Sequence, residues 1–129
     1  MSAFWRIALS SFLLASAATA ADDGFSEWWP QFQAAVKSGD ARAISANSKF
    51  PMQWELGSIR EVKSRGEFIA RFKTLFTADM TRAVAAEKPV QIPEGYMITW
   101  QARGNEYSFY FHPAAGGGFA LAGLSEGPP

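Results

Sequence analysis

The hydrophobic residues of this chain change their spacing near residue 90, and this change limits the folds open to it. Before that point, apolar side chains recur every three or four residues, which is the spacing of one helix face. From Val90 onward, apolar and polar residues alternate, as in strands with one buried face. Helices followed by a strand meander predict an α+β domain, with N-terminal helices packed on a curved antiparallel sheet.

Two helices are expected at the start of this domain. Apolar residues from Phe25 to Val36 lie on one helical face, and Ser26 is a candidate N-cap. Gly39 is suited to end this helix, because glycine readily adopts the left-handed conformation found there. Asp40 can then cap a second, short helix over 41–46.

A third helix has the clearest local signal in the chain. Ser64 and Glu67 form a capping box, in which each side chain satisfies a backbone N–H group at the helix start. An apolar stripe follows over about two and a half turns, made of Phe68, Phe72, Leu75 and Phe76. A further helix is expected over about 79–86.

The strands are predicted from alternation and from turn residues. An extended segment over 49–56 begins through Phe50-Pro51, and a short strand follows at 59–62. Two longer strands are separated by the turn Arg103-Gly104-Asn105, and a glycine-rich bend at 113–118 leads to a last strand over 119–124.

Residues 1–20 have the order of a secretory signal peptide. One positive charge at Arg6 precedes an apolar run. The small residues Ala18 and Ala20 then mark a cleavage site between Ala20 and Ala21. The run is too short and too weakly apolar for a good membrane span. We therefore expect a periplasmic or secreted protein without a membrane segment after cleavage, with a single domain over 21–129.

Composition excludes several classes of function. The chain has 12 Lys and Arg against 12 Asp and Glu, so it lacks the basic excess expected of a nucleic-acid-binding protein. It has no cysteine and one histidine, which argues against a zinc or copper site, and no motif predicts a cofactor. Without disulfides, stability must come from packing, and aromatic residues make up 15% of the chain.

The order of these elements resembles the nuclear-transport-factor-2-like superfamily, also called SnoaL-like or cystatin-like. The resemblance rests on residues spread over most of the chain after the signal peptide: Phe32, Val36, Gly39, Asp40, Phe50, Pro51, Ser64, Glu67, Phe68, Phe72 and Phe119–Leu121. It implies a cone-shaped α+β fold and is strongest to small exported members without an assigned function. The superfamily includes isomerases, cyclases, hydrolases, dehydratases, binding proteins and dimerisation domains, so the fold alone does not choose a function. Many of its members form homodimers through the sheet.

Three titratable residues are candidates for catalysis. An isomerase-like mechanism needs a desolvated carboxylate facing an apolar cone, and Asp40 and Glu55 lie in the matching regions. The position of Asp40 also fits an N-cap, and alternation with Trp54 places Glu55 toward solvent. His112 is suited to acid–base chemistry. It cannot pair with Glu106 on the same strand, because six residues of extended chain separate them by about 20 Å.

A ligand pocket is expected at the mouth of the cone. Aromatic side chains could line it, with a cationic side chain available for an anionic ligand; the predicted lining residues are Tyr96, Trp100, Tyr110, Trp54 and Arg60. Aromatic strand residues also form cores, so the same residues fit a packed interior. The expected ligand is small and either hydrophobic or anionic.

These observations favour an exported binding module without catalytic activity, because no acid, base and nucleophile converge in the sequence. The module would bind a small ligand or a protein. One alternative is an isomerase- or cyclase-like enzyme that uses Asp40 or Glu55 with Tyr96 or Tyr110. The other is a protein-interaction role, such as neutralising a toxin, through the exposed sheet face.

Overall fold

The structure is a computed structural model that describes residues 23–129. These residues form five helical segments: α2 (Phe25–Lys37), α3 (Ala41–Ala46), α4 (Arg65–Ala70), α5 (Phe72–Leu75) and α6 (Ala78–Ala86). Two strands lie between α3 and α4 in the chain, and four follow α6. The strands are β1 (Ser48–Leu56), β2 (Ile59–Val62), β3 (Val90–Ile92), β4 (Gly95–Ala102), β5 (Asn105–Pro113) and β6 (Phe119–Gly127). The predicted signal peptide and its cleavage site at Ala20 and Ala21 lie outside the described residues.

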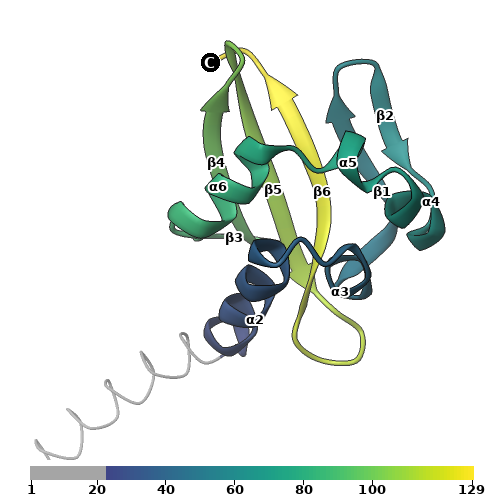
Figure 1. The fold of residues 1–129 in the computed structure, drawn as a ribbon. Helices are drawn as coiled ribbons and strands as arrows, with labels where there is room; N and C mark the ends of the chain where they lie inside the picture. Colours follow the sequence, from purple (N-terminus) through teal and green to yellow (C-terminus); the bar gives the residue numbers. More distant parts are fainter. Residues whose placement is uncertain (1–22) are drawn as a thin grey trace, which may run out of the picture.

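All six strands form one curved sheet in the order β2-β1-β6-β5-β4-β3, and the helices cover one of its faces (Figure 1). This arrangement confirms the predicted α+β class. The sheet is not wholly antiparallel, because β1 and β6 pair in parallel in its interior. The first and last strands of the chain thus meet through a long-range pairing that local sequence patterns do not encode. None of the helices within residues 23–129 is long and apolar enough to cross a bilayer.

Two predicted helix caps are present. The Asp40 carboxylate accepts a 3.1 Å hydrogen bond from the backbone N–H of Ala43, at the start of α3. The Ser64 hydroxyl likewise accepts from the N–H of Glu67, also at 3.1 Å. At α2 the expected cap was wrong: the N-cap is Gly24, and the Asp23 carboxylate accepts from the first helical N–H. These bonds satisfy N–H groups that a helix start leaves without intrahelical partners.

The helix predicted after the capping box is broken at Arg71. Its two parts, α4 and α5, meet at a residue whose backbone φ of −110° lies outside the helical range. The break lets the apolar stripe follow the curvature of the sheet, since Phe68 and Leu75 on either side are both buried.

The space between the helices and the sheet is filled by aromatic side chains. Trp28 and Phe32 of α2 pack on Phe111 of β5, with ring centroids 5.8 and 5.5 Å from it. Farther along the same strand, the Phe109 ring lies 5.6 Å from those of both Trp54 and Phe76. Such pairs add about 0.5–1.5 kcal/mol each beyond their burial. The core is thus a continuous aromatic layer.

Candidate functional site

The five residues predicted to line one pocket do not lie together. Trp54 is fully buried and donates from its indole nitrogen to the Leu75 carbonyl at 3.2 Å. Trp100 is also buried on the helix-covered face, and Tyr96 stacks on Phe25 there with centroids 3.8 Å apart. Within residues 23–129, every buried side-chain nitrogen and oxygen has a hydrogen-bond partner. These three aromatic residues are therefore structural parts of the covered face.

The other two predicted pocket residues lie elsewhere. Tyr110 lies on the open face of the sheet, on the opposite side from Trp100. Arg60 is on the edge strand β2 and donates to the backbone carbonyls of Gly57 and Ile59. The facing of Tyr110 is set by the β4–β5 turn. This turn has two residues, Arg103 and Gly104, with φ of 51° and 78°. This two-residue turn pairs Trp100 with Tyr107, so that Tyr110 faces the other way.

Neither candidate carboxylate points into an enclosed pocket. Asp40 is exposed and caps α3, as described above. Glu55 is half-buried on the open side of β1, where one of its oxygens accepts a 3.0 Å hydrogen bond from the backbone N–H of Glu126. The Gln53 amide donates to its other oxygen. Both carboxylates thus have structural partners, and neither has the desolvated surroundings that an enzymatic base requires.

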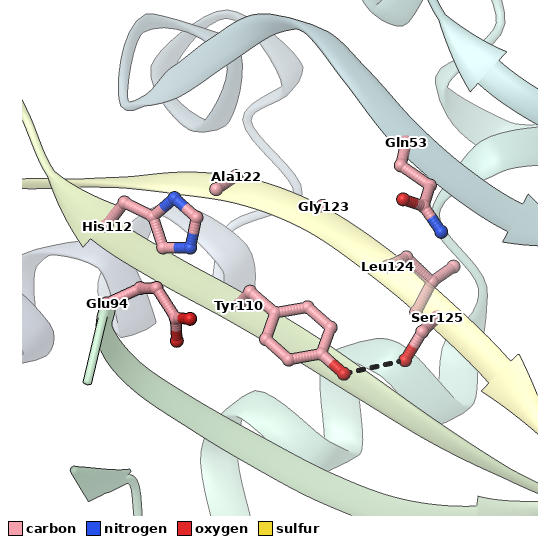
Figure 2. Close-up of a pocket in the computed structure, with 8 residues that line it drawn as sticks. All are labelled: Gln53, Glu94, Tyr110, His112, Ala122, Gly123, Leu124 and Ser125. Carbon is pink, nitrogen blue, oxygen red and sulfur yellow. Dashed lines mark hydrogen bonds between the residues drawn. The ribbon is translucent and has the colours of Figure 1, made fainter. Parts of the chain in front are cut away.

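A hollow of about 360 Å³ lies on the open face, and it contains His112 and Tyr110 (Figure 2). Its lining comes from β1, the β3–β4 turn, β5 and β6: Gln53, Glu94, Tyr110, His112, Ala122, Gly123, Leu124 and Ser125. The Tyr110 ring lies along the sheet, and its hydroxyl shares a 3.0 Å hydrogen bond with the Ser125 hydroxyl. This is the site that the folded chain offers on its uncovered side.

The strand registers explain the shape of this hollow. Tyr110 pairs with Gly123 and His112 with Ala120, but the register shifts between them, so that Ala122 is an extra residue in β6. A side chain at Gly123 would have its Cβ 3.0 Å from the Gln53 carbonyl oxygen. Glycine therefore allows β1 to approach β6 closely, and it leaves open space beside the tyrosine ring.

Glu94 is the charged residue of the hollow that sequence reasoning missed, together with the uncharged Gln53 and Ser125. It lies in the turn between β3 and β4, directly before Gly95. A Cβ on Gly95 would lie 2.1 Å from the carbonyl oxygen of Phe111, so only glycine lets this turn pack against β5 next to His112. The sequence signal is the turn Pro93-Glu94-Gly95 after a short apolar run, but the contact with β5 depends on the register of the whole sheet.

Within residues 23–129, the side chains of Glu94 and His112 form no hydrogen bond with another side chain of the hollow. The hydrogen bond drawn among the eight lining residues joins the hydroxyls of Tyr110 and Ser125 (Figure 2). The Glu94 carboxylate and the His112 imidazole lie at the other end of the Tyr110 ring. The part of the chain that the structure describes has no group of three or more His, Asp or Glu placed to hold a metal ion. The arrangement is thus suited to hydrogen bonding and stacking with an organic ligand.

A second polar cluster, on the covered side, has a structural role. The buried Asp79 accepts hydrogen bonds from Trp100 at 3.0 Å and from Thr77 at 2.9 Å, and it pairs with Arg103. Burial acts to raise the pKa of Asp79, but these hydrogen bonds more than offset it and lower the pKa below its ordinary value. The Arg103 guanidinium also lies 4.9 Å from the centre of the Tyr107 ring. The cluster therefore fixes the β4–β5 turn to α6.

Comparison with known proteins supports the fold alone. No protein-family model matches the sequence. No curated protein matches it either. Among solved structures, the chain is similar to a protein from Novosphingobium aromaticivorans described as an NTF2-like protein with a cystatin-like fold. The TM-score is 0.52 at 13% sequence identity, over 89% of this chain and 87% of that one. The protein has the nuclear-transport-factor-2-like cone fold, as the sequence resemblance implied.

Proposed function

We propose that this protein is an exported binding module without catalytic activity, and that it binds a small ligand in the open-face hollow. The observation that carries the proposal is the contrast between the two sheet faces. Packed aromatic rings fill the space between the helices and the sheet, whereas the open face has a hollow that combines an oriented tyrosine, an imidazole and a carboxylate. Small-molecule sites are concave and combine apolar surface with a few convergent polar groups, as this hollow does.

The isomerase-like alternative receives less support from the geometry. It requires a carboxylate in an enclosed apolar pocket, and Asp40 and Glu55 are held in hydrogen bonds at helix and strand backbones. The two tyrosines assigned to that mechanism also lie on different faces, since Tyr96 stacks in the core and Tyr110 is on the open side. The hollows lined by these two tyrosines include neither Asp40 nor Glu55, so no candidate carboxylate converges there with a phenol donor.

A large protein-binding patch has little support on this surface. Within residues 23–129, Val90 is the single large hydrophobic residue that is well exposed, at 59%. Protein interfaces are usually organised around a cluster of buried apolar anchors. A toxin-neutralising role would therefore have to rely on polar contacts, and a small polar ligand fits the open face better.

The proposal is tested by a fragment screen using two-dimensional amide NMR on the domain over 21–129. We expect fragments to shift the amide signals of Tyr110, His112 and Ser125, and Tyr110→Ala to weaken those shifts. As a matched control, Tyr96→Phe removes a hydroxyl on the covered face and should leave fragment binding unchanged. Shifts centred on Trp100 or α6, with the open face unaffected, would contradict the proposal.

The homodimer expected from the resemblance would cover the same face and compete with the ligand. Light scattering and the same amide spectra distinguish the two. A monomer whose open-face amides respond to fragments supports small-ligand binding. A dimer that buries Tyr110 and His112, and that fragments do not disturb, would contradict small-ligand binding and indicate that this face is the dimer interface. Native mass spectrometry of protein recovered from the periplasm or medium of the host would test both the export and any ligand retained there.

A further inference from the structure

We propose that the ligand of the open-face hollow is a small organic ammonium ion, bound over the Tyr110 ring and paired with Glu94. This inference rests on the proposed function, because it assigns a chemical class to the same site. It departs from the hydrophobic or anionic ligand expected from the sequence, since the charges that surround the hollow are now known.

The first support is the charge of the open face. Strand register and alternation place Glu55, Glu61 and Glu106 on this face, and Glu94 lines the hollow itself. The uncharged residues that the registers place there include Gln53, Val90, Met97, Thr99, Gln101, Ser108, Tyr110, His112, Ala120, Gly123, Ser125 and Gly127. Lys49, which alternation in β1 places on the same side, lines a different hollow beside Ala115 and Gly116 and is not among the residues around Tyr110. Arg60, the cation assigned to an anionic ligand, is bound to backbone carbonyls on the edge strand. The field at the hollow therefore attracts cations and repels anions.

The second support is the orientation of the aromatic ring, which is independent of the charge. The Tyr110 hydroxyl is fixed by Ser125, so the ring lies along the sheet rather than projecting from it (Figure 2). A ring in this position presents its face to the hollow, and the negative face of an aromatic ring attracts an ammonium group. Ala122 and Gly123 beside the ring leave space for the methyl or methylene groups of such an ion.

The third support is the position of Glu94 relative to that ring. Its carboxylate lies near the end of the Tyr110 ring that is away from the hydroxyl, while Gln53 lies on the other side of the hollow, on β1 across β6 (Figure 2). No hydrogen bond joins Glu94 to another lining residue. An ammonium ion over the ring would thus gain a carboxylate partner on one side and an amide carbonyl on the other. A carboxylate or phosphate ligand would meet Glu94 as a like charge.

The test compares choline with 3,3-dimethyl-1-butanol, which has the same shape but no charge, by amide NMR titration of the monomer at mildly alkaline pH and low salt. We expect choline to shift the signals of Tyr110, His112 and Gly123, with an affinity about 5- to 30-fold greater than that of the alcohol. Glu94→Gln should weaken choline binding by about 3- to 10-fold and leave the alcohol unchanged. Glu106→Gln, on the same face but outside the hollow, should have little effect.

Two further variants separate the ring from its hydroxyl. Tyr110→Leu should weaken choline binding, whereas Tyr110→Phe should largely preserve it, because the ring face is retained. Equal binding of choline and the neutral alcohol in the hollow would overturn the ammonium assignment while leaving the small-ligand site intact. Absence of choline shifts in the hollow would also overturn it. If fragments of every charge also failed to bind in the hollow, the proposed small-ligand function would be contradicted as well.

Discussion

The indole nitrogen of Trp100 donates a 3.0 Å hydrogen bond to the carboxylate of Asp79, and this bond joins the sheet to helix α6. Both residues are buried, and the same carboxylate also pairs with Arg103 of the β4–β5 turn. One acidic side chain of α6 therefore holds both β4 and the turn that follows it, more than 20 residues farther along the chain. Because a buried donor without an acceptor is costly, Asp79 should be the most sensitive polar position in the domain.

Asp79→Ala should lower the free energy of unfolding by about 2 kcal/mol, because the Trp100 indole loses its acceptor. Asp79→Asn should cost less, about 1 kcal/mol, since the amide oxygen can still accept that hydrogen bond. Urea unfolding followed by tryptophan fluorescence measures both. Glu87→Gln, an exposed change just after α6, is the control and should stay within about 0.5 kcal/mol. Equal stability of Asp79→Ala and the wild type would contradict the structural role.

The stability contributed by Asp79 should depend on acid pH. Its pKa is lower in the folded state than the ordinary value of 3.8, so its stabilising contribution is fully present above that value. The contribution is lost as the pH falls through the lower folded pKa. The stability difference between the wild type and Asp79→Asn should therefore shrink between neutral pH and about pH 2. A difference that stays constant over this range would show that the carboxylate charge is irrelevant.

Tyr96 should ionise later than an ordinary tyrosine. Its hydroxyl donates to Asp23 at 2.5 Å, and this bond together with burial raises the pKa of Tyr96 to about 12. The resulting stabilisation is present below the ordinary value of 10.0 and is lost as the pH rises toward 12. An ultraviolet absorbance titration should show a late component that is missing in Tyr96→Phe. Loss of a component near 10 instead would indicate that the bond to Asp23 does not form.

Asp40 should behave as a helix cap rather than a catalytic acid. Asp40→Ala should cost about 1 kcal/mol, whereas Asp40→Asn should cost only a few tenths, because asparagine caps helices equally well. Thermal unfolding of the two variants beside the wild type makes the comparison. An asparagine variant as unstable as the alanine variant would mean that the charge, rather than the cap, is important.

Gly95→Ala should disturb both stability and the open-face hollow. The added Cβ would lie 2.1 Å from the Phe111 carbonyl oxygen, at a backbone φ of 150° that suits glycine. The β3–β4 turn must then move away from β5, and Glu94 moves with it. We expect a loss of about 2 kcal/mol or more, and changed amide signals around His112. Gly116→Ala, where a Cβ meets nothing within 4 Å, should be neutral. A neutral Gly95→Ala would contradict the close packing of this turn.

Local sequence patterns predicted most elements of the fold. The caps at Asp40 and Ser64 depend on neighbouring residues only, and the alternation expected after Val90 is present in β5, where Tyr107, Phe109 and Phe111 are buried on one face. These features are set within a few residues of chain, where propensity and hydrogen bonding act directly.

The candidate site was harder to predict, because it depends on register. The sequence pattern predicts three residues in the turn after Ala102, but the structure has two. A change of one residue in a turn changes which side chains of the two strands share a face, so the pattern alone does not decide whether Trp100 and Tyr110 lie together. The place of Glu94 beside His112 depends on a close backbone approach at Gly95. Neither relation has a local signal, since each joins strands through the assembled sheet.

The parallel pairing of β1 with β6 also determines when this domain can become stable during synthesis. The Glu55 carboxylate accepts from the Glu126 N–H across 71 residues of chain, so β1 lacks its inner neighbour until the last strand is made. Closing so long a loop is slow and must precede the gain from sheet pairing. A nascent chain would thus lack a complete sheet until its last strand is made, a property that would favour the export proposed above.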